Sequence, residues 1–220
     1  MQKIISRLQF ITYQEIEKPS SQQALEYCAG GGDWIQLGIK NKPEDYILSQ
    51  ARKCNSICQH YGATFIINDN PHLAIEVDAD GVHLSKNHIN VAEARNIIGS
   101  QKIIGATANT FEDIVHLAEQ GADYLFLGTY GHTGTSRDIN PELNLNDYTE
   151  ILKCCDTNNI DIPIIAIGAI TMEDFAELFE TGIHGVAISS YLANQDNIGE
   201  STLNTLTEIG KAHSFSFIKR

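Results

Sequence analysis

The chain has 220 residues, which is enough for one substantial hydrophobic core, and α/β barrels of this length are commonly a single domain. Acidic residues outnumber basic ones by 28 to 15, which gives a formal charge of −13. A field of that sign repels nucleic acids and anionic membranes, so the composition argues against both as partners. A phosphorylated small-molecule substrate would need local cations.

The cysteines do not follow a metal-binding pattern. Their number, five, is odd; Cys54 and Cys58 lie one helical turn apart, and Cys154 and Cys155 are adjacent. Reduced thiols are therefore the simpler interpretation. We find no secretory signal and no apolar run as long as a membrane span, so we expect a cytoplasmic protein. Whether it forms a homo-oligomer is left open.

Short apolar runs alternate with helix-like segments along the chain. The predicted strands cover residues 8–12, 34–40, 63–69, 81–85, 102–108, 124–129, 162–168 and 185–190. Between them, apolar residues three and four apart, such as Ile114, Leu117 and Ala118, predict amphipathic helices. Several strands are apolar nearly throughout, as expected for a parallel sheet covered on both faces.

Eight strands, each followed by a helix or a loop, predict an α/β fold, a single-domain (β/α)8 TIM barrel over residues 1–220. A doubly wound open sheet is the structural alternative. The one long loop, residues 129–146, is typical of a functional segment.

Polar and small residues gather where the predicted strands end. In chain order they are Gln36, Lys40, Asn68, Asp69, Ser85, Lys86, Asn87, His88, Thr107, Asn109, Thr133, Thr135, Ser136, Arg137, Gly168, Ala169, Ser189 and Ser190. In a barrel these residues converge on the rim that carries the active site.

Several of these residues have both a functional and a plain interpretation. The small residues in AIGAIT and AISSYL would let main-chain N–H groups approach a phosphate. Asp69 is either an oxygen ligand for Mg²⁺ or the N-cap of the next helix. Lys40 is either a cation in an anion site or a solvated lysine, and Thr133–Ser136 fits ordinary turn chemistry. His83 we interpret as a satisfied core histidine.

The order and spacing of several segments are more specific. They are WIQLGIK, FIINDN, ADGVHLS, IIGATANT, GADYLFLGTYGHTGTS, IPIIAIGAIT and GIHGVAISS, between about residues 7 and 195. In these segments the chain resembles the thiamine phosphate synthases. The resemblance implies a TIM-barrel transferase that uses Mg²⁺. Such an enzyme joins a hydroxymethylpyrimidine diphosphate to a thiazole phosphate and releases diphosphate.

The resemblance also implies roles for individual residues. Lys40, Thr107 and Arg137 are the catalytic candidates, and Asp69 and His88 are the metal candidates, for Mg²⁺ or alternatively Mn²⁺. The implied substrate-binding residues are Gln36, Lys40, Asn68, Thr107, Asn109, Thr133, Thr135, Ser136, Gly168, Ala169, Ser189 and Ser190.

The chain departs from the family pattern at charged positions. Gly38 stands where the family usually has an arginine, His88 where it has a metal-binding aspartate, and Ser136 where it has a lysine. Ala169 replaces the second glycine of the phosphate turn. Losing one donor to developing charge typically costs about 2.7–4 kcal/mol of barrier, so the losses at Gly38 and Ser136 together predict impaired turnover unless Arg137 and Lys86 compensate.

Two alternatives to an active or impaired synthase follow from these departures. One is a related barrel protein that binds a thiazole phosphate or another phosphorylated ligand without the transfer. A tautomerase of this kind is disfavoured, because its catalytic histidine would align with Asn109. The other is a different phosphate-using barrel enzyme or a binding protein in an acidic oligomer.

Overall fold

Eight parallel strands close into a barrel within residues 4–86, 88–131 and 142–218, which the computed structural model describes. The strands are β1 (Leu8–Ile11), β2 (Trp34–Leu37), β3 (Thr64–Asn68), β4 (Gly81–Leu84), β5 (Ile103–Ala108), β6 (Tyr124–Tyr130), β8 (Ile164–Gly168) and β9 (Gly185–Ile188). Pairing runs in chain order, and β9 pairs with β1. The predicted barrel is therefore confirmed, and the open doubly wound sheet is wrong.

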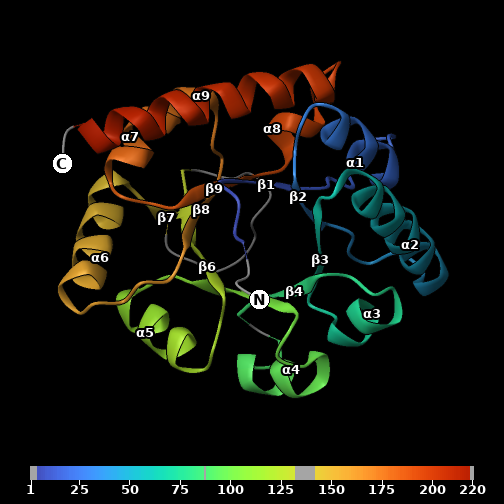
Figure 1. Ribbon diagram of the computed structural model, residues 1–220, viewed down its shortest axis with the longest axis horizontal. Coiled ribbons are helices and arrows are strands. Elements are labelled where there is room, and N and C mark those ends of the chain that lie inside the picture. The colour runs from blue at the N-terminus through green and yellow to red at the C-terminus, as the bar shows by residue number, and fades with distance from the viewer. Residues whose placement is uncertain (1–3, 87, 132–141, 219–220) are drawn as a thin grey trace.

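Helices surround the barrel (Figure 1). They are α1 (Ser20–Ala29), α2 (Glu44–Tyr61), α3 (Pro71–Glu76), α4 (Val91–Ile98), α5 (Phe111–Glu119), α6 (Leu145–Thr157), α7 (Phe175–Glu180), α8 (Ser190–Ala193) and α9 (Ile198–Ile218), with a 3-10 turn, η1 (Met172–Asp174), before α7. The long α9 contacts α7, α8 and α1, which covers the junction between the first and last strands. None of the described helices is long and apolar enough to cross a membrane.

Two hydrophobic clusters fill the molecule. A large outer cluster lies between the strands and the helices, and it explains why the strands are apolar on both faces. A smaller inner cluster fills the barrel interior, and its buried members are Trp34, Ile66, Ile103, Tyr124, Phe126, Ile165 and Ala187. The interior is thus a packed core, which leaves the rim as the place for a ligand.

The second strand is shorter than predicted. We expected it to reach Lys40, but β2 ends at Leu37. Beyond that point side chains of the β1–α1 loop bind the main chain: Gly38 N–H donates to Thr12 Oγ1 over 2.9 Å, and Lys40 N–H donates to Gln14 Oε1 over 2.7 Å. Because these donors are used by side chains, the strand ladder stops.

The predicted 129–146 loop also contains regular structure. Its last part includes a two-residue strand, β7 (Glu142–Leu143), which pairs with the end of β6, and the start of α6. Asn144 caps α6, because its side chain accepts hydrogen bonds from the N–H groups of Asn146 and Asp147.

Candidate active site

A chain of hydrogen bonds joins the ends of β2, β3 and β4 at the rim. Gln36 Nε2 donates to Asn68 Oδ1 over 2.7 Å, and Asn68 Nδ2 donates to Asp69 Oδ2 over 2.6 Å. Ser85 donates to both oxygens of the same carboxylate, from its N–H over 2.7 Å and from its hydroxyl over 3.0 Å. The structure therefore brings Gln36, Asn68 and Asp69 together, as the barrel prediction required.

The Asp69 carboxylate determines which group donates and which accepts in each of these hydrogen bonds. An ionised carboxylate only accepts hydrogen bonds, so the Asn68 amide must turn its NH2 group toward Asp69. Its oxygen then faces Gln36 and takes the Gln36 NH2 group. Gln36 Oε1 is left buried without a partner among the described residues. The rim thus offers a buried acceptor that a ligand N–H can satisfy, because unpaired buried polar atoms are costly.

Asp69 does not cap the following helix. The cap of α3 is Asn70, whose side chain accepts from Leu73 N–H over 2.9 Å. Asp69 adopts the left-handed backbone conformation, with φ of 58°, and its N–H donates to His83 O over 2.8 Å. The N-cap alternative is therefore wrong, because the carboxylate turns back toward β4 and away from α3.

His88 lies beside Asp69, as a metal site would require. Its Nε2 is 3.6 Å from Asp69 Oδ2, and its side chain is half exposed. Three of the roughly four lone pairs of the Asp69 carboxylate already accept hydrogen bonds, so one remains for a metal. No group of three acidic, histidine or cysteine ligands occurs in the described part of the chain. These residues fit a metal held largely by substrate oxygens and water.

Lys40 is exposed at the rim on an anchored loop. Burial, with a smaller contribution from the Lys40 charge, lowers the pKa of His83 to about 3. A cation at this rim is suited to bind phosphate oxygens. The exposure of Lys40 fits both a cation in an anion site and a solvated lysine.

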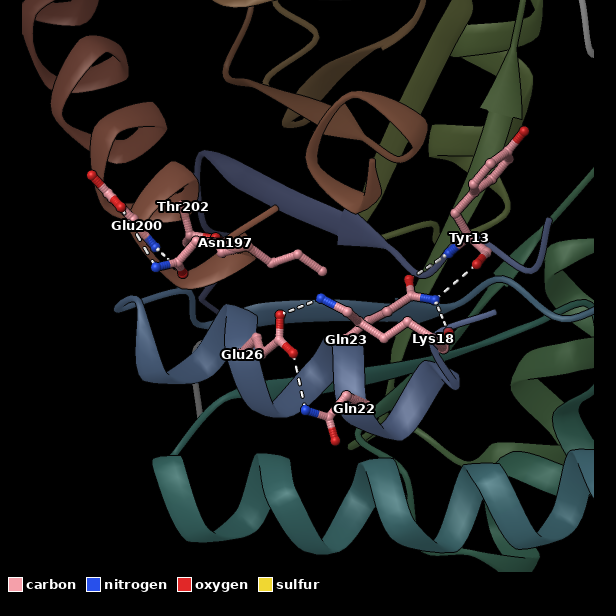
Figure 2. A network of polar contacts seen from close by, with 9 residues as sticks. Tyr13, Lys18, Gln22, Gln23, Glu26, Asn197, Glu200 and Thr202 are labelled. Carbon is pink, nitrogen blue, oxygen red and sulfur yellow. Dashed lines mark hydrogen bonds and ion pairs between the residues drawn. The ribbon is translucent and has the colours of Figure 1, made fainter. Parts of the chain in front are cut away.

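The loop that holds Lys40 is itself clamped (Figure 2). Gln23 on α1 is buried, accepts from Tyr13 N–H and donates to the main-chain oxygens of Tyr13 and Lys18, each over 2.8 Å. Lys18 in turn forms a 2.6 Å ion pair with Glu26 on α1. The β1–α1 loop is therefore tied to α1 at both ends, and its Gln14 is positioned to hold Lys40. No local sequence pattern indicates these loop contacts, so the role of Gln23 is visible only in the structure.

Gly38 lies where its neighbours leave no space for a side chain. A Cβ added there would lie 2.1 Å from Thr12 O, which real structures essentially never show. Its φ is not among the positive values of the chain. The glycine is thus required by close packing against β1 rather than by an unusual backbone angle.

Thr107, near the end of β5, and Asn109, just beyond it, lie at the same rim. Thr107 Oγ1 is 3.0 Å from Nε2 of His83, whose Nδ1 is 3.1 Å from the Tyr124 hydroxyl. His83 is buried and hydrogen-bonded on both sides, as interpreted from the sequence. Asn109 is buried, and its N–H donates to Asp113, which also pairs with Lys86 over 2.9 Å.

The turns after β8 and β9 match the predicted phosphate site only in part. Gly168 and Ser189 lie at the same end of the barrel as Thr107. However, Ala169 N–H donates to Tyr130 O over 2.9 Å. That bond conflicts with the main-chain phosphate role implied for Ala169. Ser190 is exposed and begins α8.

Four implied residues, Thr133, Thr135, Ser136 and Arg137, and also Asn87, lie outside the described residues. One cavity, of about 250 Å³, lies at the opposite end of the barrel, near Arg7 and His184. A second, of about 230 Å³, is lined by Ser85, His88 and Thr107, among others. The second cavity is the candidate ligand site, because it adjoins the hydrogen-bonded rim.

Comparisons with known proteins identify the family of this chain. A sequence model described as thiamine monophosphate synthase matches residues 8–192. A thiamine-phosphate synthase of Phocaeicola vulgatus is 43% identical over 195 residues, covering 88% of this chain and 94% of the relative. One of Flavobacterium johnsoniae is 41% identical over 191 residues, covering 87% and 90%.

Solved structures of other proteins share the fold of this chain. A thiamine phosphate pyrophosphorylase from Pyrococcus furiosus superposes with a TM-score of 0.83 at 26% identity, covering 94% of this chain and 96% of the other. A "Native KDPGal structure" superposes with a TM-score of 0.67 at 15% identity, covering 99% of both chains, and shares the fold alone.

Proposed function

Because this chain belongs to the thiamine monophosphate synthase family, we propose that it joins a hydroxymethylpyrimidine diphosphate to a thiazole phosphate, forming thiamine phosphate and diphosphate. The C–O bond between the pyrimidine methylene and the diphosphate breaks, and its electron pair leaves with the diphosphate. A C–N bond forms between that methylene and the thiazole nitrogen. The transferase family predicted from the sequence is confirmed by these relatives.

The observation that carries the proposal is the hydrogen-bonded rim from Gln36 to Asp69 and Ser85. It presents a buried acceptor at Gln36 Oε1, which Asn68 links to the Asp69 carboxylate, and the Thr107 hydroxyl lies at the same end of the barrel, on β5. An aminopyrimidine offers an N–H group for that acceptor. Its diphosphate offers oxygens for the Thr107 hydroxyl and the Lys40 ammonium.

Little acid–base chemistry falls to side chains in this reaction. The protein contributes mainly by holding the two substrates in line and by stabilising negative charge on the leaving diphosphate. Lys40 serves as a point charge for that purpose. The anchored β1–α1 loop supports it, because a misplaced cation stabilises the leaving group less.

We further propose Asp69, with His88 beside it, as the protein's contribution to a Mg²⁺ site. A bound Mg²⁺ would neutralise charge on the diphosphate. The single free lone pair of Asp69 and the nitrogen of His88 make a weak site for this oxygen-preferring ion. The diphosphate itself would then supply most of the ligands, so that metal and substrate bind together.

The rival function is a relative that binds the phosphorylated ligands without joining them. Three observations favour it: the closed space at Gly38, the occupied N–H of Ala169, and a histidine at residue 88. A diphosphate-release assay with both substrates and Mg²⁺ separates the two functions. Release that depends on both substrates supports the synthase, whereas binding of the substrates by calorimetry without release supports the rival.

A further inference from the structure

A line of polar groups crosses the otherwise apolar barrel interior. It runs from Gln9 on β1 to Tyr124 on β6, then to His83 on β4 and Thr107 on β5. Gln9 Nε2 is 3.3 Å from the Tyr124 hydroxyl oxygen, which is 3.1 Å from His83 Nδ1. His83 Nε2 is 3.0 Å from Thr107 Oγ1. Of the four residues, only Thr107 is not buried.

Packing holds the middle of this line rigidly. The His83 ring stacks on Phe126 with centroids 3.9 Å apart, and Tyr124 meets Trp34 edge-on at 4.8 Å. A Cβ at Gly105 would lie 2.1 Å from the Tyr124 ring, so that glycine makes the space for it. The tyrosine and the histidine therefore cannot turn away from each other without repacking the barrel core.

The direction of the hydrogen bonds follows from the end at Gln9. In the observed orientation Gln9 donates to the Tyr124 oxygen and leaves its own Oε1 unpaired. Turning the amide over would put an N–H group where Oε1 now lacks a partner among the described residues. Buried unpaired N–H groups are rarer than under-used carbonyl oxygens, so the observed orientation is favoured.

Every later proton in the line is then assigned. The Tyr124 oxygen accepts from Gln9, so its own proton points to His83 Nδ1. Because Nδ1 of the buried His83 ring accepts this proton, Nδ1 carries none of its own, so the ring is neutral and has one proton. That proton is on Nε2, because Nδ1 is the acceptor, and it is donated to Thr107 Oγ1.

We propose that this line of hydrogen bonds holds the Thr107 hydroxyl with its proton directed to the mouth of the barrel, as a donor to a substrate phosphate oxygen. No acceptor for that proton lies within hydrogen-bond distance among the described residues. Gln9, Tyr124 and His83 are thus positioning residues that act through Thr107. The identity of the substrate rests on the proposed function, but the proton arrangement does not.

The proton arrangement is tested directly by nitrogen NMR of the protein labelled on histidine. The signals of His83 are assigned by their loss in His83→Gln. We expect Nε2 of His83 to be protonated and Nδ1 to be unprotonated. A proton on Nδ1, or a charged ring at pH 7, would overturn the proposal. This measurement needs no substrate, so it stands even if the wild type releases no diphosphate.

The effect on the substrate is tested with paired variants. His83→Leu removes the donor to Thr107, whereas His83→Gln keeps an N–H group near the place of Nε2. We expect His83→Leu to weaken binding of the pyrimidine diphosphate about tenfold and His83→Gln to stay within about threefold, with thiazole phosphate binding unchanged in both. Equal losses in both variants and for both ligands would indicate a purely structural role and contradict the proposal.

A double-mutant comparison separates the line from general packing. In a Thr107→Val background, His83→Leu should cause no further loss, because the hydroxyl through which it acts is gone. Additive losses would contradict the proposal.

Tyr27→Phe is the matched control for Tyr124→Phe. Tyr27 is also fully buried, but its hydroxyl donates to Leu8 O, outside the line. Only Tyr124→Phe should weaken pyrimidine diphosphate binding. Equal effects of the two tyrosine variants would contradict a role for the line of hydrogen bonds.

Discussion

Gly38 is held against Thr12 at two points. Its N–H donates to Thr12 Oγ1 over 2.9 Å, and the main-chain oxygen of Thr12 lies 2.1 Å from the position that a Cβ on Gly38 would take. The family's arginine cannot be added to this chain without moving β1 or the loop after it. The missing cation and the closed contact therefore occur at the same residue.

This contact predicts the outcome of Gly38→Ala. We expect a loss of about 1–3 kcal/mol in the free energy of unfolding, because the methyl group overpacks the site. Denaturation in urea measures it. Gly210→Ala in α9 is the control, since nothing lies within 4 Å of its added Cβ, and it should stabilise slightly. Gly38→Arg should therefore not restore activity by itself, and a stable, faster Gly38→Arg enzyme would contradict this account.

Lys40→Ala should weaken binding of the pyrimidine diphosphate by about tenfold or more, with little effect on the thiazole phosphate. The reason is that a point charge in the loop after β2 is expected to face one ligand rather than both. Calorimetric titration with each ligand measures the difference. Lys42→Ala, which removes an exposed lysine two residues further on, is the matched control. Equal losses for both ligands would remove Lys40 from the diphosphate site.

His88→Asp should increase Mg²⁺ affinity about tenfold in the absence of substrate. A second carboxylate beside Asp69 suits this oxygen-preferring ion better than a nitrogen 3.6 Å from Asp69 Oδ2. Metal titrations of the wild type, His88→Asp and His88→Ala measure it. If the wild type and His88→Ala bind Mn²⁺ equally at pH 7.5, His88 is not a ligand.

Removing Gln23 should release the loop that supports Lys40. Gln23→Ala loses three hydrogen bonds of a buried amide, so we expect roughly 2–3 kcal/mol less stability and a higher KM for the pyrimidine diphosphate. Gln22→Ala is the control, because its exposed amide bonds only Glu26 on the same helix. A stability loss without any change in KM would separate the loop from the site.

The buried His83 predicts an acid sensitivity of folding. Burial, aided by the Lys40 charge, lowers the pKa of His83 to about 3 from 6.5. Between these values the unfolded chain binds a proton that the folded protein does not. The stability contribution is thus full above pH 6.5 and falls by about 1.4 kcal/mol per pH unit as the pH decreases toward 3.

His83→Gln should therefore lose less stability than the wild type on acidification. Between pH 7 and pH 5 the free-energy difference between wild type and variant should shrink by about 2 kcal/mol. Urea denaturation at both pH values measures it. His72→Gln, at an exposed position of α3, should show no such change. A constant difference for His83→Gln would mean that the histidine is not held neutral.

The order of strands, the barrel and the family were all predictable from the sequence. The sequence features that indicate them are local. The apolar run at residues 124–129 matches β6, and the motifs around Gln36 and Asp69 follow each other with the spacing of the family they resemble. Because the C-terminal ends of parallel barrel strands share one rim, the chain order alone placed those residues near each other. The match to thiamine-phosphate synthases confirmed the family.

Other features were decided only by the tertiary structure. β2 ends at Leu37, although the sequence predicted a strand as far as Lys40. Asp69 turns toward Ser85, where the sequence favoured neither the metal ligand nor the helix cap. Both outcomes depend on partners from other loops. Gly38 contacts a residue 26 positions earlier, and His83 a tyrosine 41 positions later. Strand register decides such contacts between residues distant in sequence, and a one-residue shift would turn each side chain to the other face. The barrel's register therefore determines which polar groups are paired inside it and which face a ligand.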